Sequence, residues 1–235
     1  MTCNEFYDLL TSRGLILNEI QKNQFHRFFE CLVEWNERMN LTGITEEADV
    51  YAKHFYDSLD PFLEMELAEV KTICDVGTGA GFPGMPLAIA YPQIQFDLID
   101  SLGKRIDFLN FCIDELGLSN VHAIHVRAEE FASDKREYFD VVTSRAVARL
   151  PILAELCAPF VKLGGYFVTL KGPAGATELI EAKQGPSKLG LAHEKTSTAS
   201  IKAVGERVNI YFKKVSKTPS KYPRQFGKIK KNPLI

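Results

Sequence analysis

Cysteine is scarce in this chain of 235 residues, and its distribution argues against two kinds of small-protein architecture. The five cysteines are odd in number and scattered, and no C-x-x-C pair occurs among them. A disulfide framework or a zinc site normally shows paired or closely spaced cysteines. We therefore expect free thiols, no bound metal and a reduced, cytoplasmic setting.

Long apolar runs are also missing. None approaches the roughly 18 residues that a membrane-spanning helix requires. Asn4, Glu5 and Asp8 occur early, and no basic segment leads into an apolar one, so the beginning of the chain does not look like a secretory signal. We expect no contact with a membrane.

Acidic residues are absent from residues 207–235, although the whole chain carries a net charge of only −2. Nine of the 28 basic residues lie in this segment, which leaves 19 basic against all 30 acidic residues elsewhere. A basic tail on an acidic body suggests a polyanionic partner that binds through the tail. The alternative is a solvated terminus without a partner.

The length and the hydrophobic share of 46% fit one full globular domain with a smaller appendage. We expect residues 1–65 to form a helical N-terminal extension, because Phe25, Phe28, Phe29, Leu32 and Val33 recur at helical spacing. Core packing explains these aromatic residues better than stacking on bases does. We expect residues 66–215 to form the main domain and residues 216–235 a basic tail with little regular structure.

The main domain alternates short apolar runs with amphipathic stretches. We expect strands at residues 72–76, 95–100, 121–126, 139–143 and 166–170, and an antiparallel edge strand at 207–213. Helices are expected at roughly 83–91, 103–117, 151–160 and 176–184, and a loop at 185–190. This order predicts an α/β fold with a mostly parallel sheet and helices on both faces.

A glycine-rich segment, ICDVGTGAGFPG (73–84), follows the first predicted strand. Pro83 suits the first turn of a helix, so residues 77–82 are a loop between strand and helix. A dinucleotide fingerprint that opens at Gly77 would need glycine at the position of Phe82, and the frame from Gly79 begins two residues late. An NAD-dependent oxidoreductase is therefore the weaker interpretation.

Read from Gly77, the loop is G-x-G-x-G with Asp75 two residues ahead, and it resembles motif I of the class I S-adenosylmethionine-dependent methyltransferases. A carboxylate near the loop suits a ligand with a cationic amino acid end. Asp100 ends the second strand, where it can accept hydrogen bonds from both ribose hydroxyls, each contributing about 1.5–3 kcal/mol. An acid at that position also occurs in NAD enzymes, so Asp100 alone does not discriminate.

Further motifs occur in order along the chain. They are NLTGIT (40–45), KHFYDSL (53–59), DVGTGAGFPGMPLAI (75–89), DSLGKR (100–105), SRAVAR (144–149), LKG (170–172) and KYPR (221–224). Together they resemble the glucose-inhibited division protein B family, the bacterial 16S ribosomal RNA guanine-N7 methyltransferases. The resemblance runs from about residue 30 to the end, although residues 172–206 carry little of the pattern.

This resemblance implies a Rossmann-like methyltransferase domain with a mostly parallel seven-stranded sheet, and S-adenosylmethionine as the cofactor. It implies 16S ribosomal RNA or the small ribosomal subunit as the partner, and no obligate protein partner is evident. The cofactor contacts that we expect are Asp75, Gly77, Gly79, Gly81, Phe82, Asp100, Ser101, Ala128, Glu129 and Arg145. The RNA contacts that we expect are Lys104, Arg105, Lys221, Arg224, Lys228, Lys230 and Lys231.

Guanine N7 carries a lone pair and no proton, so its attack on a methyl group needs no general base. Positioning then supplies the catalysis, and good alignment can equal effective molarities of roughly 10⁵ M or more. We expect Arg145 to be the catalytic residue, as a positioning group that contacts the cofactor, guanine O6 or a phosphate. His54 and Asp57, three residues apart, are expected to be a structural pair.

Two further interpretations remain open at this point. A small-molecule methyltransferase would share the glycine loop, but it leaves the basic tail and the helical extension without a purpose. A ribosome-binding module without activity would keep the fold and the tail and transfer no methyl group.

Overall fold

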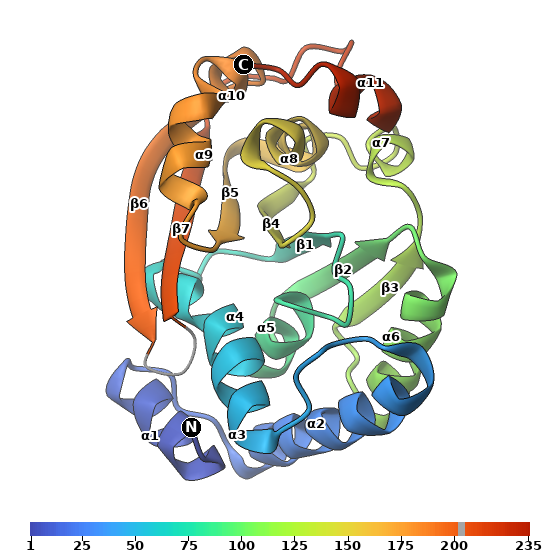
Figure 1. The fold of residues 1–235 in the computed structure, drawn as a ribbon, viewed down its shortest axis with the longest axis vertical. Helices are drawn as coiled ribbons and strands as arrows, with labels where there is room; N and C mark the ends of the chain where they lie inside the picture. Colours follow the sequence, from blue (N-terminus) through green and yellow to red (C-terminus); the bar gives the residue numbers. More distant parts are fainter. Residues whose placement is uncertain (202–204) are drawn as a thin grey trace.

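A seven-stranded sheet forms the centre of the molecule (Figure 1). The structure is a computed structural model, and it describes residues 1–201 and 205–235. The strand order is β3-β2-β1-β4-β5-β7-β6. The strands are β1 (Thr72–Val76), β2 (Gln95–Asp100), β3 (Val121–His125), β4 (Phe139–Arg145), β5 (Val161–Lys171), β6 (Leu191–Ile201) and β7 (Gly205–Lys214). The predicted α/β fold is confirmed.

Strands β1 to β5 run parallel, and β7 is antiparallel to both β5 and β6. Residues 73–76 of β1 are buried, on both faces of the sheet, which explains why they are apolar apart from Asp75. Val76 pairs with Ile99, so the loop that follows β1 begins beside Asp100 at the end of β2. The sheet thus brings the glycine loop and this carboxylate together.

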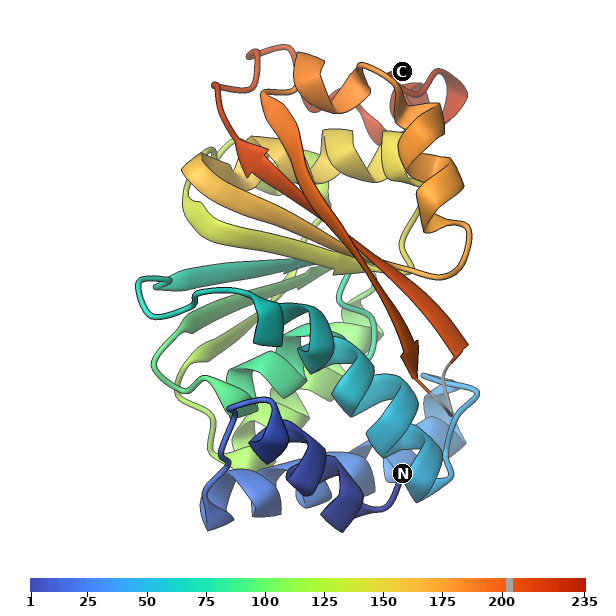
Figure 2. The same ribbon diagram turned by 90° about the vertical axis from the view of Figure 1, so that its left-hand side faces the viewer.

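Helices cover both faces of the sheet, as Figure 2 shows. The N-terminal helices lie on the same face as α5 (Gly84–Ala90) and α6 (Gly103–Leu116), and the later helices cover the other face. The N-terminal elements are α1 (Cys3–Ser12), α2 (Glu19–Met39), α3 (Glu47–Val50), the π-helix η1 (Tyr51–Tyr56), α4 (Asp57–Leu59) and the 3-10 helix η2 (Asp60–Glu64). The later ones are α7 (Ala128–Phe131), α8 (Leu150–Cys157), the 3-10 helix η3 (Ala158–Phe160), α9 (Gly175–Ala182), α10 (Gly185–Lys188) and α11 (Phe226–Lys231).

Aromatic packing joins the N-terminal helices to the main domain. Phe28 of α2 is fully buried, and its ring lies 5.5 Å from that of Phe82 in the glycine loop and 6.5 Å from that of Phe108 in α6. Gln21, in the first turn of α2, donates hydrogen bonds to the carbonyls of Ile89 and Ala90 at the end of α5. The aromatic spacing in the first 35 residues therefore serves core packing, as predicted.

Three local expectations were wrong. The expected loop at 185–190 contains the short helix α10, and the tail contains α11. The strand expected at 166–170 begins five residues earlier, because β5 starts at Val161 and includes Gly164 and Gly165. In the tail, Ile229 is fully buried, and Arg136 donates hydrogen bonds to the carbonyls of Thr218 and Tyr222. Tertiary contacts thus order segments that have no regular pattern of their own.

No helix within residues 1–201 and 205–235 is both long and apolar enough to cross a membrane. All five cysteines are free thiols.

Candidate functional site

The strand order reverses between β1 and β4, and ligands of open α/β sheets bind at the carboxyl ends of the strands beside such a point. Three cavities lie there. The loop cavity, of about 430 Å³, is lined by the glycine loop and the ends of β2 and β4. The small cavity, of about 130 Å³, lies between β2 and α7. The β5 cavity, of about 550 Å³, lies at the ends of β4 and β5.

The glycine loop adopts backbone angles that few residues other than glycine tolerate. The φ angles are 71° at Gly77 and 65° at Gly79, both in the left-handed region. A side chain at Gly77 would also collide with Val147, which follows β4. The sequence therefore needs glycine here for two reasons, the turn and the close approach of a neighbouring loop.

Asp75 lies beneath this loop and does not line the loop cavity. Its Oδ2 accepts hydrogen bonds from the Thr78 hydroxyl (2.7 Å) and the Gly84 amide (2.9 Å), whereas Oδ1 is buried without a hydrogen-bond partner among the described residues. Complete burial raises the pKa of Asp75 to about 7, although the two hydrogen bonds oppose the shift. The expected cofactor contact of Asp75 thus appears in the structure as support for the loop.

Asp100 lines both the loop cavity and the small cavity, so its carboxylate lies where the two meet. One oxygen accepts a hydrogen bond from the Gly79 amide (3.0 Å) and pairs with Arg105 (3.1 Å). The other accepts a hydrogen bond from the Leu102 amide (2.9 Å). These bonds fix the carboxylate. Oδ2 already accepts two hydrogen bonds, whereas Oδ1 accepts one and can accept a further bond from a ligand hydroxyl.

The small cavity is mostly apolar and narrow. Ala128 and Glu129 of α7, two of the expected cofactor contacts, line it together with Ser101. Phe226, at the start of α11, completes the lining. This contribution was not predicted, because only the charge of the tail and the KYPR motif (221–224) stood out, and the motif ends before Phe226.

Arg145, at the end of β4, lines both the loop cavity and the β5 cavity. Its guanidinium donates to Asp57 Oδ2 (3.0 Å) and to the carbonyl of Lys53 (3.2 Å), and it lies over the ring of Phe82, 5.0 Å from the centroid. Asp57 Oδ1 accepts a second bond, of 2.7 Å, from Arg207 of β7. The acid therefore fixes arginines from two strands, and the expected separate pair of His54 and Asp57 is instead part of a network around Arg145.

His54 lies beside this network. Its ring stacks on Phe82 at a centroid distance of 4.5 Å, and Nε2 lies 2.8 Å from the Thr42 hydroxyl. Burial, followed by the charge of Arg145, lowers the pKa of His54 to about 3. The imidazole is therefore neutral near pH 7.

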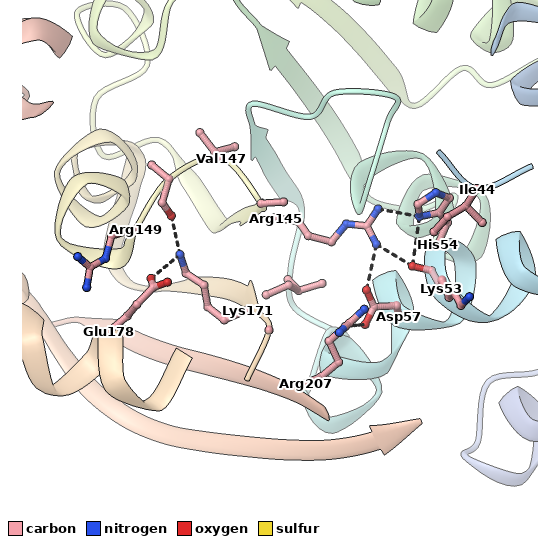
Figure 3. A pocket seen from close by; sticks show the side chains of 14 residues that line it. Ile44, Lys53, His54, Asp57, Arg145, Val147, Arg149, Lys171, Glu178 and Arg207 are labelled. Atoms are coloured by element: carbon pink, nitrogen blue, oxygen red, sulfur yellow. Dashed lines mark hydrogen bonds and ion pairs between the residues drawn. The ribbon is translucent and has the colours of Figure 1, made fainter. Parts of the chain in front are cut away.

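Figure 3 shows charged side chains on two opposite sides of the β5 cavity. Arg145, Asp57 and Arg207 lie on one side. On the other, Lys171 at the end of β5 donates to the carbonyl of Ala148 (2.6 Å) and pairs with Glu178 of α9 (2.9 Å). Lys171 belonged to a recognised motif, but no sequence signal pointed to Glu178.

Of the expected cofactor contacts, all line the loop cavity or the small cavity except Asp75 and Gly81. Gly81 is instead a packing position, because a side chain there would meet Met85 and Leu109.

The expected RNA contacts fall into two groups. Lys104, Lys221, Lys228, Lys230 and Lys231 are exposed. Arg105 pairs with Asp100, and Arg224 forms an ion pair with Glu155, whose side chain is fully buried. Lys104 lies at a shallow hollow beside residues 39–41.

A search of the described residues for groups of three or more potential metal ligands finds none.

Comparisons with known proteins point to one family over most of the length of this chain. A family model described as rRNA small subunit methyltransferase G matches residues 21–208. The chain is 47% identical to the ribosomal RNA small subunit methyltransferase G of Brevibacillus brevis, over the full length of both chains. It is 48% identical to the protein of that name from Staphylococcus carnosus, over 96% of each chain.

Solved structures resemble the fold at low sequence identity. A 16S rRNA (adenine(1408)-N(1))-methyltransferase mutant from Catenulisporales acidiphilia superposes with a TM-score of 0.54 at 13% identity, over 63% of this chain and 87% of that one. A SAM dependent methyltransferase from Aquifex aeolicus gives 0.52 at 19% identity, over 68% and 91%. These similarities show the fold alone.

Proposed function

Because the chain belongs to the rRNA small subunit methyltransferase G family, we propose that it transfers the methyl group of S-adenosylmethionine to N7 of a guanine in 16S ribosomal RNA. The transfer is a direct in-line attack without a general base. The reaction takes place where Arg145 separates the loop cavity from the β5 cavity.

The observation that carries the cofactor assignment is the placement of the Asp100 carboxylate between two cavities of different character. The narrow, apolar small cavity suits an adenine ring. The loop cavity suits the amino acid end of the cofactor, because the glycine loop lets the backbone approach closely. Asp100 then lies at the ribose between them, and Ser101 lines both cavities. The residues present therefore fit this cofactor.

The absence of a general base agrees with the chemistry of the residues around the reacting position. S-adenosylmethionine, when bound, supplies a methyl carbon that is electrophilic because it is attached to a sulfonium. His54 is the imidazole among the described lining residues, and a pKa near 3 makes it a poor proton acceptor at neutral pH. Guanine N7 has no proton to remove. Arg145 instead provides a fixed positive group beside the reacting atoms and holds the base or its phosphate in position.

The exposed lysines of the tail supply a contact surface for the phosphates of the RNA. Lys228, Lys230 and Lys231 lie on α11, next to the Phe226 edge of the small cavity. RNA held there passes close to the cofactor.

The test is methyl transfer from radiolabelled S-adenosylmethionine to 16S ribosomal RNA. The RNA is offered naked, in small subunits, and in subunits from cells that lack this gene. We expect label in N7-methylguanine at one position of the subunit or the RNA. Label on another atom, or no label on any of the three substrates, would contradict the proposal.

A further inference from the structure

We propose that the β5 cavity receives the target guanine nucleotide and that Glu178 reads its N1–H and N2 amino groups. This inference rests on the proposed function, which it extends from the reacting atom to the recognition of the base. It depends on the position of the cavity, its charge, and the hydrogen-bonding state of Glu178.

The position of the cavity suits a methyl acceptor. It shares His54, Arg145, Ala146 and Val147 with the loop cavity, so the two spaces adjoin along these residues. Its volume of about 550 Å³ lies within the usual range for small-ligand sites of about 300–1,000 Å³. A base in this cavity can turn one edge toward the cofactor and the opposite edge toward Lys171 and Glu178.

The charge of the cavity suits a nucleotide. Its lining carries five cationic side chains, namely Lys53, Arg145, Arg149, Lys171 and Arg207. The two carboxylates that face them are Asp57 and Glu178. The surplus of positive charge attracts the phosphates on either side of the target base.

Glu178 is held in place while one of its oxygens stays available. Oε2 accepts a hydrogen bond from the Leu150 amide (2.7 Å) and forms an ion pair with Lys171 Nζ (2.9 Å), whereas Oε1 accepts no hydrogen bond from the described residues. The side chain is 15% exposed, so the carboxylate is shielded from bulk water and still reachable from the cavity. Asp57 is less suited to this role, because Arg145 and Arg207 occupy both of its oxygens.

The two edges of guanine match the two ends of this arrangement. N7 and O6 lie on one side of the base, and the donors N1–H and N2–H lie away from N7. If N7 faces the loop cavity, these donors face the wall that carries Glu178. Adenine presents an acceptor at N1 and has no amino group at C2, so the carboxylate would meet a lone pair. Glu178 therefore selects guanine both by attraction and by repulsion of the wrong base.

The first experiment uses the wild-type protein and substituted RNA. The guanine that carries the methyl group is replaced by inosine, which keeps N7 and O6 and lacks only the N2 amino group. We expect kcat/KM to fall about tenfold to a hundredfold, the usual effect of removing one hydrogen bond to a charged group. Equal turnover of guanine and inosine would overturn the assignment of Glu178.

The second experiment uses Glu178→Gln, which keeps the shape of the side chain and replaces one acceptor oxygen by an amide donor. We expect a loss on guanine of about tenfold to a hundredfold, near-equal rates on guanine and inosine, and unchanged affinity for S-adenosylmethionine. Retention of the full preference for guanine would contradict the inference. The matched control is Glu181→Gln on the same helix, because Glu181 pairs with Arg149 and does not line the cavity. It should leave the preference intact.

Failure of this inference can be told apart from failure of the proposed function. RNA with 7-deazaguanine at the target position has no N7 to methylate and keeps both donors that Glu178 would bind. Methyl transfer to that RNA would overturn the proposed N7 chemistry. The inosine comparison concerns the recognition of the base alone.

Discussion

Arg145 combines a buried ion pair, an aromatic contact and a place on the wall between two cavities. Its guanidinium is planar, so it can meet Asp57 at one edge while its face lies on Phe82. A lysine could supply the charge without this geometry. The motif predicted that Arg145 would be near the cofactor, but Asp57 and Arg207 come from distant segments, and a linear sequence does not reveal which charges meet.

We predict that Arg145→Ala lowers both the affinity for S-adenosylmethionine and the turnover. The loss in kcat should be about a hundredfold, because the contact that holds the base or its phosphate in line with the methyl group disappears. Isothermal calorimetry and single-turnover methyl transfer measure the two effects. Arg145→Lys should recover only a small part of the activity. Wild-type affinity and turnover in Arg145→Ala would contradict the assigned role.

Asp75 illustrates a residue whose type was informative while its role was not. An acid two residues before the glycines was expected to contact the ligand. In the structure it holds the loop through Thr78 and Gly84. The spacing of a motif shows that a carboxylate is needed near a loop, but only the register of β1 places it below the loop.

We predict that Asp75 makes the folded protein less stable as the pH rises. Its pKa is raised from about 4 to about 7 on folding, so its carboxyl is neutral in both states at low pH and is penalised in the folded state once it ionises. Between about pH 5 and about pH 8, the free energy of unfolding of the wild type should fall by roughly 2–3 kcal/mol relative to that of Asp75→Asn. Urea unfolding of both proteins at the two pH values measures this difference, and a constant difference would refute the prediction.

At the scale of elements, strong periodic patterns were predicted well and weak ones were not. The helix expected at 103–117 is α6, which ends at Leu116 before Gly117 in the left-handed conformation. In contrast, α11 has too few apolar residues for a helical pattern, and the burial of Ile229 and the ion pair of Arg224 with Glu155 hold it in place. Strand β6 has two Thr and two Ser among its eleven residues, and its pairing with β7 compensates for this weak pattern.

The order within the tail changes how its role in RNA binding must be tested. Truncation after Ser216 would remove Phe226 from the small cavity and expose the carboxylate of Glu155, so it would not isolate the charge effect. Lys228→Ala, Lys230→Ala and Lys231→Ala change exposed side chains only.

We predict that each of these three substitutions weakens RNA binding and spares the affinity for S-adenosylmethionine. The slope of log affinity against log salt should become shallower by about 0.7 for each phosphate of single-stranded RNA that is no longer neutralised. Filter binding over a range of salt concentrations measures the slope. The control is Lys162→Ala, because Lys162 lies at the beginning of β5, away from the carboxyl ends of the strands. Slopes equal to the wild type in all three variants would exclude RNA binding by α11.

At the scale of the whole molecule, the N-terminal helices form part of the site. Lys53, His54 and Asp57 line the β5 cavity, while Leu41 and Thr42 line the loop cavity. The aromatic contacts around Phe28 and Phe55 connect these residues to the glycine loop through Phe82. The helical pattern predicted an extension packed on the core, but it could not show that the extension also supplies a wall of the site.

This arrangement predicts that the extension and the main domain unfold together. Trp35, the single tryptophan of the chain, lies in α2 and packs on Phe108 and Phe111 of α6, so its fluorescence reports the packing between the two parts. Urea unfolding curves from Trp35 fluorescence and from far-ultraviolet circular dichroism should coincide.

Phe28→Ala should lower the free energy of unfolding by about 3–5 kcal/mol, and both curves should report the same decrease. It should also weaken S-adenosylmethionine binding, because the ring of Phe28 no longer supports Phe82. The control is Ile180→Ala, at a side chain that is largely exposed. It should change neither the free energy of unfolding nor the affinity for S-adenosylmethionine. If Trp35 fluorescence changed at a lower urea concentration than the dichroism, the extension would be a separate folding unit, and its residues could not be a rigid wall of the site.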